Sequence, residues 1–269
     1  MLEVDNLVVN FANASGGKTE ALKGVSFTLK PGETLGIVGE SGSGKSVFAL
    51  TAMGLLPQSA YTHGSLKLNG QDLLSLSEKS LCQIRGVNIG MVFQEPMSAL
   101  NPAMTIGEQV AEAILLHQSV SPQSALDKAK HLLTQVKMPD IEQKIHAYPH
   151  QLSGGQRQRV CIAIALALEP DILIADEPTT ALDVTVQAQV LSVIKQLVKE
   201  MGIALILISH DIGVIATMTE RTLVMYRGEV MEQGKTLDIL RAPQHSYTQR
   251  LLASLPRRTQ RRLGIEVIL

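Results

Sequence analysis

The amino-acid sequence predicts an α/β protein with a mostly parallel sheet, an N-terminal antiparallel β subdomain and an inserted α-helical subdomain. Leu2–Asn10 and Ala21–Leu29 alternate apolar and polar residues, as two strands do on either side of a polar turn at 13–18. Farther along, two apolar strands at Ile172–Ala175 and Ile203–Ser209 flank a helical stretch, and this β-α-β pattern predicts parallel pairing. Between these halves, residues 105–146 are mostly helical in character.

The helix predicted between the two apolar strands, Val184–Met201, carries a stripe of apolar residues at helical spacing. The stripe consists of Val186, Val190, Ile194, Leu197 and Met201. Local signals predict four further features: a helix start at Ser121-Pro122, a helix stop at Met138-Pro139, a hairpin over Thr222–Gly234 turning at Arg227-Gly228, and a helix at His245–Ser254.

A glycine-rich segment lies between a short apolar run, Thr34–Val38, and a stretch with helical propensity, Val47–Met53. It matches G-x-x-x-x-G-K-[ST] and consists of Gly39, Glu40, Ser41, Gly42, Ser43, Gly44, Lys45 and Ser46. Glycines let such a loop point its N–H groups at phosphate oxygens, Lys45 would reach the β and γ phosphates, and the Ser46 hydroxyl would bind Mg²⁺. Chance matches in a chain of this length are rare, roughly 1%. The sequence therefore predicts a P-loop NTPase core.

Two acidic residues, Asp176 and Glu177, follow the apolar strand at Ile172–Ala175. This order places them at the carboxyl end of the sheet, where open α/β folds bind ligands. Asp176 is suited to hold Mg²⁺ through water, and Glu177 to orient or deprotonate the water that attacks the γ phosphate. Such a pair alone could equally be a helix cap, but with the glycine loop upstream it favours the metal and water roles.

A second glycine-containing segment precedes a long helical run that extends through Leu168. Its residues are Leu152, Ser153, Gly154, Gly155 and Gln156. Ser153 stands where an N-cap would, and the two glycines leave backbone N–H groups bare, which predicts a second anion site. A plain Ser-capped helix would explain Ser153 but not the glycines and Gln156.

The balance of acidic and basic residues argues against one class of protein. The chain has 24 Lys and Arg against 25 Asp and Glu, which argues against a general nucleic-acid binder. Its basic tail, with Arg257, Arg258, Arg261 and Arg262, is expected to be solvated, the alternative being contact with acidic lipid.

The longest apolar run, Val160–Leu168, is too short to span a membrane, and the acidic N-terminus is unlike a secretion signal, so the protein is expected to stay where it is made. Cys82 and Cys161 lack metal-site spacing and are expected to be packing residues.

Together the motifs resemble the nucleotide-binding domain of an ATP-binding cassette (ABC) protein. The resemblance is carried by GESGSGKS at 39–46, LSGGQ at 152–156, Asp176-Glu177, and His210 after a third strand. It covers residues 1–256, with the helical subdomain at about 95–160 and the basic tail at 257–269.

The resemblance implies roles for single residues. Gln94 would sense Mg²⁺ and the attacking water, and His210 would act as a switch on the γ phosphate. Asp183 would contact a second domain, and Phe11 would stack on adenine, although an aromatic at a strand end is also a common core residue. Two such domains would bind head to tail, so that the glycine loop of one and the LSGGQ of the other enclose each ATP.

Three longer segments resemble ATPases of peptide and nickel importers, in particular the first of the two ATPase subunits of di- and oligopeptide systems and the N-terminal half of fused ATPases. They are FQEPMSALNP at 93–102, DEPTTALDVTVQAQ at 176–189 and HSYTQRLLASLP at 245–256. Relatives often continue into a cysteine-bearing extension that can hold an iron–sulfur cluster; this sequence lacks it, so no metal cluster is expected. Met97–Met104 would meet the coupling helix of the membrane subunit, unless it is an ordinary connector.

The implied function is ATP hydrolysis, with Mg²⁺, in an ABC importer of di- or oligopeptides at the cytoplasmic face of the inner membrane. The implied partners are a second ABC ATPase (a sister chain or a copy), two integral membrane permease subunits and, indirectly, an extracytoplasmic solute-binding protein. A nickel or other small-solute importer is the alternative within the family. A soluble ABC ATPase of DNA repair or ribosomes is disfavoured by the lack of a coiled-coil arm or zinc insertion, and an exporter by the segments at 93–102 and 245–249.

Overall fold

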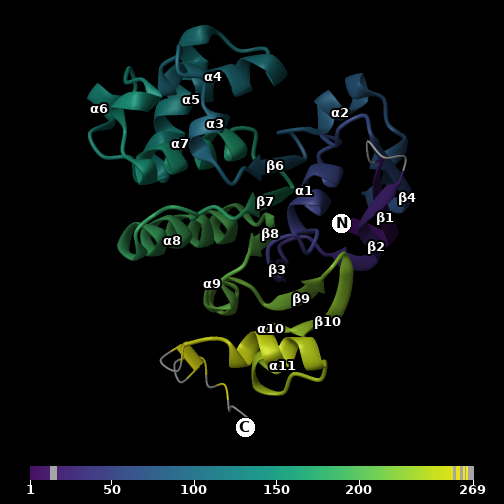
Figure 1. The fold of residues 1–269 in the computed structure, drawn as a ribbon. Helices are drawn as coiled ribbons and strands as arrows, with labels where there is room; N and C mark the ends of the chain where they lie inside the picture. The colour runs from purple at the N-terminus through teal and green to yellow at the C-terminus, as the bar shows by residue number, and fades with distance from the viewer. Residues whose placement is uncertain (13–16, 257–258, 261–262, 264, 266–269) are drawn as a thin grey trace. The chain divides into compact units, whose positions relative to one another are not determined.

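The computed structural model describes residues 1–12, 17–256, 259–260, 263 and 265 (Figure 1). The chain forms two compact units, one of Met1–Leu81 with Ile206–Leu269 and one of Cys82–Leu205. The basic cluster Arg257, Arg258, Arg261 and Arg262, and residues 13–16 of the predicted turn, lie outside the described residues. Of the helices within the described part, none combines the length and apolar character needed to span a bilayer.

The first unit contains the expected N-terminal antiparallel sheet, with strand order β2-β1-β4-β5. Its strands are β1 (Leu2–Ala12), β2 (Lys18–Leu29), β4 (Ala60–Leu68) and β5 (Gln71–Asp72). Val4 of β1 lies opposite Phe27 on one side and Leu66 on the other, and all three side chains are buried. The alternation seen in the sequence therefore produces one apolar face, as antiparallel sheets commonly have. Strand β2 begins three residues before the predicted start at Ala21.

The same unit carries β3, which leads into the glycine loop, and three later strands. They are β3 (Thr34–Val38), β8 (Ala204–Ser209, which the unit boundary crosses), β9 (Arg221–Tyr226) and β10 (Glu229–Lys235). Strand β3 pairs with β9 in parallel, and β9 pairs with β10 as the predicted hairpin turning at Arg227 and Gly228. The helical elements are α1 (Lys45–Ala52), η1 (Leu73–Ser75), α2 (Glu78–Ile84, also crossed by the boundary), α9 (Ile212–Met218), α10 (Thr236–Arg241) and α11 (Ser246–Ala253).

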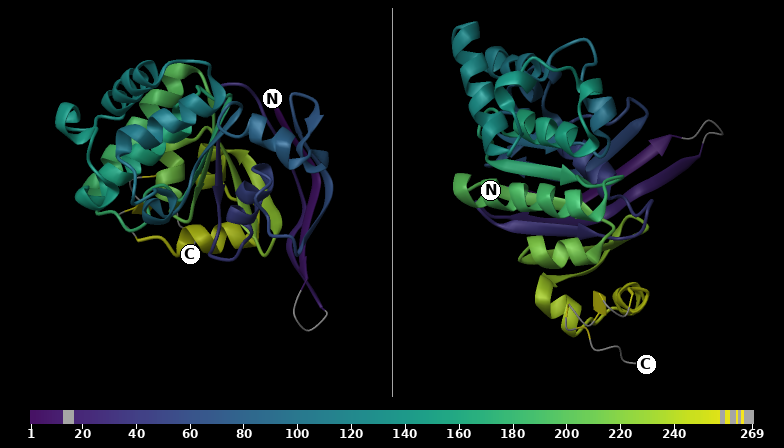
Figure 2. Two further views of the ribbon diagram at one scale, coloured as in Figure 1. Left: turned by 90° about the horizontal axis from the view of Figure 1, so that it is seen from above. Right: turned by 90° about the vertical axis from the view of Figure 1, so that its left-hand side faces the viewer.

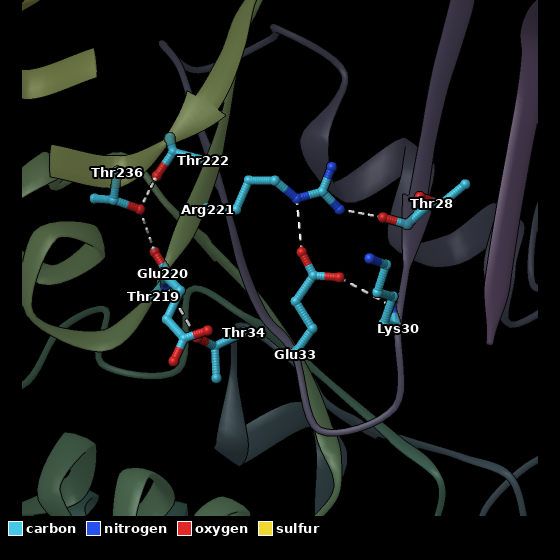
Figure 3. A network of polar contacts seen from close by, with 9 residues as sticks. All are labelled: Thr28, Lys30, Glu33, Thr34, Thr219, Glu220, Arg221, Thr222 and Thr236. Carbon is cyan, nitrogen blue, oxygen red and sulfur yellow. Dashed lines mark hydrogen bonds and ion pairs between the residues drawn. The ribbon is translucent and has the colours of Figure 1, made fainter. Parts of the chain in front are cut away.

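A polar network joins the end of β2 to the start of β9 within this unit (Figure 3). Arg221 donates from Nε to Glu33 Oε1 at 2.7 Å and from Nη2 to the carbonyl of Thr28. The other oxygen of Glu33 accepts from the backbone N–H of Lys30 at 2.8 Å. Beside this pair, the hydroxyls of Thr222 and Thr236 lie 2.8 Å apart, in a buried contact. Arg221 of β9 therefore ties the parallel strands both to β2 of the antiparallel sheet and to the turn that follows β2.

The second unit holds two parallel strands and most of the helices. Strand β6 (Ile89–Val92) pairs with β7 (Ile172–Asp176), and Val92 lies opposite Ala175. The helical elements are α3 (Pro96–Ala99), α4 (Ile106–His117), α5 (Pro122–Gln135), α6 (Ile141–Lys144), η2 (Pro149–Gln151), α7 (Gly154–Leu166) and α8 (Val184–Met201). Helices α4, α5 and α7 pack against one another as the teal cluster in Figures 1 and 2. The unit therefore contains the helical segment that the sequence predicted.

Helix α5 begins as predicted and ends early. The Ser121 hydroxyl caps its first turn by accepting from the N–H of Ser124, and Pro122 is the first helical residue. The helix ends at Gln135, before the predicted stop at 138–139, because Lys137 takes a left-handed conformation with φ 59°. The buried guanidinium of Arg159 donates to the Val136 carbonyl at 2.6 Å and satisfies this helix end.

At the centre of α8, the residues of the predicted apolar stripe are buried. Val190, Ile194 and Leu197 are buried, whereas Val186 and Met201 near the two ends are only half-buried.

One of the two cysteines is a packing residue as expected. Cys161 of α7 is buried, and this burial raises the pKa of its thiol to about 12. The prediction for Cys82 was wrong, because it is exposed. Helix α2 buries Leu81 and Ile84, and Cys82 falls on the opposite side of the helix.

Glu33→Gln is expected to lower the free energy of unfolding by about 1–3 kcal/mol, because it leaves the partly buried Arg221 guanidinium without its carboxylate. The matched control is Glu229→Gln, whose partner Lys23 lies 3.3 Å away in a more exposed pair. Glu229→Gln should lower the free energy of unfolding by only about 0–1 kcal/mol. Urea unfolding of both variants measures the difference, and equal losses would contradict a special role for the Glu33 pair.

Candidate functional site

The glycine loop joins β3 to α1 and has the conformation that its glycines allow. Gly42 and Gly44 have φ values of 79° and 101°, in the left-handed region that other residues rarely adopt. Gly44 occupies the N-cap position of α1, and no side chain caps this helix. The first turn of α1 therefore offers backbone N–H groups and the positive end of the helix dipole, the arrangement that binds phosphate.

The Lys45 ammonium lies inside the loop. Its Nζ donates to the carbonyls of Gly39 at 2.8 Å and Glu40 at 2.9 Å and lies 3.4 Å from the Ser43 hydroxyl, with the residue only 5% exposed. A buried ammonium needs such oxygen partners. Their positions fix the cation within the loop itself, so a positive charge is already in place for phosphate oxygens.

Two of the loop glycines are required by close packing. A Cβ atom on Gly39 would lie 2.1 Å from the Met225 carbonyl of β9, and one on Gly44 would lie 2.7 Å from the Ala21 carbonyl of β2. A Cβ on Gly42, by contrast, would meet nothing within 4 Å. The sequence predicted one shared role for these glycines, exposing N–H groups, and did not predict the packing role of Gly39 and Gly44.

The predicted switch residue His210 follows β8, which neighbours β3 in the sheet, and its side chain is exposed. The residues beside it form a cap: Asp211 Oδ1 accepts from the N–H of Gly213, and Ser209 Oγ accepts from the N–H of Asp211. This turn fixes the backbone at His210 before α9 begins. Phe11, the residue predicted to stack on adenine, is half-buried near the end of β1, opposite Thr19 and Ala60.

In the second unit, the two residues predicted to handle the attacking water meet directly. Gln94 Nε2 donates to Glu177 Oε2 at 3.2 Å. The register of β6 against β7 brings them together, because Gln94 follows the end of β6 by two residues and Glu177 follows β7 directly. Asp176, the last residue of β7, is 4% exposed.

Glu177 has an unusual backbone for a residue that is not glycine, with φ 46°. Such conformations cost of order 1–3 kcal/mol and occur preferentially at functional sites. Glu177 Oε2 also accepts from the hydroxyl of Thr180 at 2.9 Å, and the Thr180 N–H donates to the Glu177 carbonyl. Thr180 therefore orients the carboxylate from within its own turn. Sequence analysis missed this residue, although a hydroxyl three positions after an acid in a turn is a signal of such a contact.

The LSGGQ segment forms a capping box at the start of α7. Ser153 Oγ accepts from the N–H of Gln156, and Gln156 Oε1 accepts from the N–H of Ser153. A Cβ on Gly155 would lie 2.3 Å from Val186 Cγ1, so this glycine lets α7 and α8 approach closely. Gln156 and Gly155 therefore have local structural roles that a plain Ser cap did not include, and the anion site at this segment stays a prediction. Leu152 is buried at the same place.

Asp183 is the N-cap of α8. Its Oδ1 accepts from the N–H groups of Thr185 at 3.1 Å and Val186 at 3.0 Å. The next side chain, Val184, is 81% exposed. Asp183 thus has a structural role in this chain, beside the predicted contact with a second domain.

The chemistry of the predicted magnesium ligands fits that ion. Ser46, Gln94 and Asp176 offer hydroxyl, amide and carboxylate oxygens, which Mg²⁺ prefers. Within the described residues no group of three His, Cys, Asp or Glu side chains is arranged to hold a metal. Mg²⁺ at phosphate sites commonly keeps waters and phosphate oxygens as ligands, so it needs no such protein cage.

The sequence is similar to those of importer ATP-binding proteins. It is 51% identical over 263 residues to the glutathione import ATP-binding protein GsiA of Escherichia coli O157:H7, an alignment that covers 95% of this chain and 42% of the relative. The chain thus spans less than half the length of that protein. It is 49% identical over 259 residues to the dipeptide transport ATP-binding protein DppD of Bacillus subtilis, covering 96% of this chain and 77% of the relative.

The fold is similar to that of a solved cassette. A dimeric structure of the ATP-binding cassette MJ0796, in a post-hydrolysis state with bound ADP and Pi, superimposes with a TM-score of 0.78 at 31% identity and covers 88% of this chain and 99% of that one. The family model for ABC transporters matches residues 22–180, which include the glycine loop, the LSGGQ segment and the acidic pair. The chain therefore belongs to the ABC transporter family, as one of its ATP-binding cassettes.

Proposed function

We propose that this chain is the ATP-hydrolysing subunit of an importer that takes up di- or oligopeptides through membrane permease subunits. The observation that carries the proposal is the 49% identity to a dipeptide transport ATP-binding protein over 96% of the chain. Glutathione, named for the other relative, is itself a tripeptide, so both names fit cargo of short peptides. The site geometry supports the ATPase chemistry.

ATP is held first by the loop 39–46. The N–H groups at the start of α1 donate hydrogen bonds to the phosphate oxygens, and the Lys45 ammonium, already fixed at the loop, pairs with the β and γ oxygens. Ser46, Gln94 and, through water, Asp176 would hold Mg²⁺, which neutralises charge on the transferred phosphoryl group. Phe11 would stack on the adenine ring.

Hydrolysis would depend on the pair at the end of β6 and β7. The Glu177 carboxylate, oriented by Thr180, takes a proton from water as that water attacks the γ phosphorus and the bond to the bridging oxygen breaks, releasing ADP and phosphate. Gln94, which is hydrogen-bonded to Glu177, would sense whether the metal and the attacking water are present. His210 would contact the γ phosphate.

A second cassette would complete each site. Leu152, Ser153, Gly154, Gly155 and Gln156 would cover the ATP held by the partner, and Asp183 would lie at the contact between the two chains. The dimeric state of the similar cassette structure supports pairing, and the partner is a sister chain or a second copy. Contacts to the γ phosphate from both chains exist only while ATP is intact, so hydrolysis would open the pair.

Transport requires contact with membrane subunits. Met97, which is 57% exposed, lies in Met97–Met104, where we place the coupling helix of a permease subunit. We place the complex at the cytoplasmic face of the inner membrane, with an extracytoplasmic solute-binding protein delivering cargo to two permease subunits. Uptake of nickel or another small solute is the alternative, because the cargo does not touch the ATPase.

Lys45→Ala is expected to weaken ATP binding by about tenfold to a hundredfold, because a charge-assisted contact to phosphate is lost. Fluorescent-nucleotide titration measures the affinity. Lys79→Ala on the exposed side of α2 is the control and should bind as the parent does. Unchanged affinity in Lys45→Ala would count against the glycine-loop assignment.

Glu177→Gln is expected to bind ATP normally and to hydrolyse it at least about a hundredfold more slowly, because an amide cannot take the proton from water. ATP turnover measures the loss of hydrolysis. ATP-dependent dimer formation in size-exclusion chromatography measures whether ATP is still bound. The exposed Glu112 of α4 supplies the control, Glu112→Gln, with parental turnover. Parental turnover in Glu177→Gln would exclude the proposed role.

The transport assignment is tested by affinity purification of the tagged chain from detergent-solubilised native membranes, followed by mass identification of the proteins that come with it. Two multi-spanning proteins and a second cassette ATPase are expected. Recovery of ribosomal or DNA-bound proteins instead would leave the ATPase chemistry standing and overturn the transport role.

A further inference from the structure

Helix α11, near the C-terminal end of the chain, contacts the glycine loop. The hydroxyl of Tyr247 accepts from the backbone N–H of Glu40 at 3.4 Å, although the two residues are 207 positions apart. The Glu40 carbonyl accepts from Lys45 Nζ and from the N–H of Ser43. Tyr247 and Lys45 thus both hydrogen-bond to the backbone of Glu40, Tyr247 at its N–H and Lys45 at its carbonyl.

Tyr247 is itself fixed by an aromatic neighbour. Its ring lies 4.3 Å from that of Tyr226, centroid to centroid, at an interplanar angle of 31°. The guanidinium of Arg227 lies over the Tyr226 ring at 5.0 Å. Tyr247 is 4% exposed, and burial raises its pKa above the usual value for tyrosine, so the hydroxyl keeps its proton near neutral pH. The ring is therefore held against the last residue of β9.

The turn that follows β9 contacts the loop at a second point. The N–H of Gly228 donates to the Ser43 carbonyl at 3.0 Å, and the Gly228 carbonyl accepts from the N–H of Lys23 at 2.8 Å. Gly228 has φ 86°, and a Cβ there would lie 2.7 Å from the Ala21 carbonyl. The hairpin turn therefore fits between the loop and β2, and only glycine fits there.

The start of α11 is anchored to β10. Glu232 accepts from the N–H groups of Gln244 and His245, one on each carboxylate oxygen. His245 Nδ1 in turn accepts from the N–H of Tyr247 and caps the helix. The cap explains the histidine of the HSYTQ segment, and the hydroxyl contact with Glu40 explains the tyrosine; the function proposed above uses neither residue.

We propose that Tyr247 is a positioning residue for the glycine loop, through which α11 sets the affinity of the site for nucleotide phosphates. The inference rests on the proposed ATPase function. Tyr247 acts on the start of a loop that cradles the phosphates common to ATP and ADP, and its hydroxyl is hydrogen-bonded to the backbone of Glu40, which has no proposed part in the hydrolysis step. Loss of the Tyr247 hydroxyl should weaken the binding of ATP and ADP equally and leave kcat unchanged.

The test is Tyr247→Phe, which keeps the buried ring and removes only the hydroxyl. The matched control is Thr248→Val on the same helix turn. Thr248 is fully buried, and its hydroxyl has no hydrogen-bond partner among the described residues. Each change removes one hydroxyl from α11, and of the two hydroxyls the one on Tyr247 is hydrogen-bonded to the loop. The measurements are ATP and ADP affinities, KM and kcat for ATP, thermal unfolding, and hydrogen exchange of the loop peptide 39–46.

Tyr247→Phe should raise the dissociation constants for ATP and ADP and the KM by about two- to tenfold, the range expected for losing one neutral hydrogen bond. Exchange at the loop should quicken, while kcat stays within about twofold. Thr248→Val should keep parental affinity. Parental affinity in Tyr247→Phe, or an equal loss in Thr248→Val, would overturn the positioning role.

Two further outcomes separate this inference from the function on which it rests. If the parental chain binds ATP and Lys45→Ala binds it more weakly, but Tyr247→Phe binds as the parent does, only the role of Tyr247 fails. If the parental chain binds neither ATP nor ADP, the proposed function fails and the role of Tyr247 fails with it.

Discussion

The arrangement of the first unit depends on one buried cation, the Lys45 ammonium. A charge that is withdrawn from water must be surrounded by oxygen atoms, and here the loop's own carbonyls at Gly39 and Glu40 supply them. Those carbonyls can turn inward only if the backbone curls through left-handed positions at Gly42 and Gly44. The curled loop then presses against β9 and β2 so closely that Gly39 and Gly44 have no room for a side chain. The surrounding strands thus fix the shape of the loop to which we assign the nucleotide phosphates.

A second constraint, strand register, organises the other unit. Because Val92 of β6 lies opposite Ala175 of β7, the residues after the two strands emerge together, and Gln94 reaches Glu177. The strained backbone at Glu177 is held by its turn, in which Thr180 bonds both the carboxylate and the carbonyl of that residue. The surrounding contacts overcome the cost of the strain, and the carboxylate is fixed in one orientation.

Several motif residues serve the fold as well as the proposed chemistry. Ser153 and Gln156 cap α7, Gly155 admits α8, and Asp183 caps that helix. A side chain that stabilises a helix end is also rigid, and rigidity is what a contact with a partner's nucleotide would require. The two accounts of these residues are therefore compatible, and the capping contacts explain how the segment is fixed before any ligand is present.

The sequence by itself determined what depends on neighbours along the chain. The glycine loop, the cap at Ser121-Pro122, the turn at Arg227-Gly228 and the strand that ends at Asp176 follow from φ preferences, capping and periodicity. Only the tertiary structure decided which distant residues meet. Gln94 lies 83 positions from Glu177, and Tyr247 lies 207 positions from Glu40. Such contacts depend on which distant segments pack together. A local pattern can mark an apolar helix face, as it did at the centre of α8, but it does not identify the residues that meet that face. The exposure of Cys82 likewise follows from the packing of α2, which covers Leu81 and Ile84.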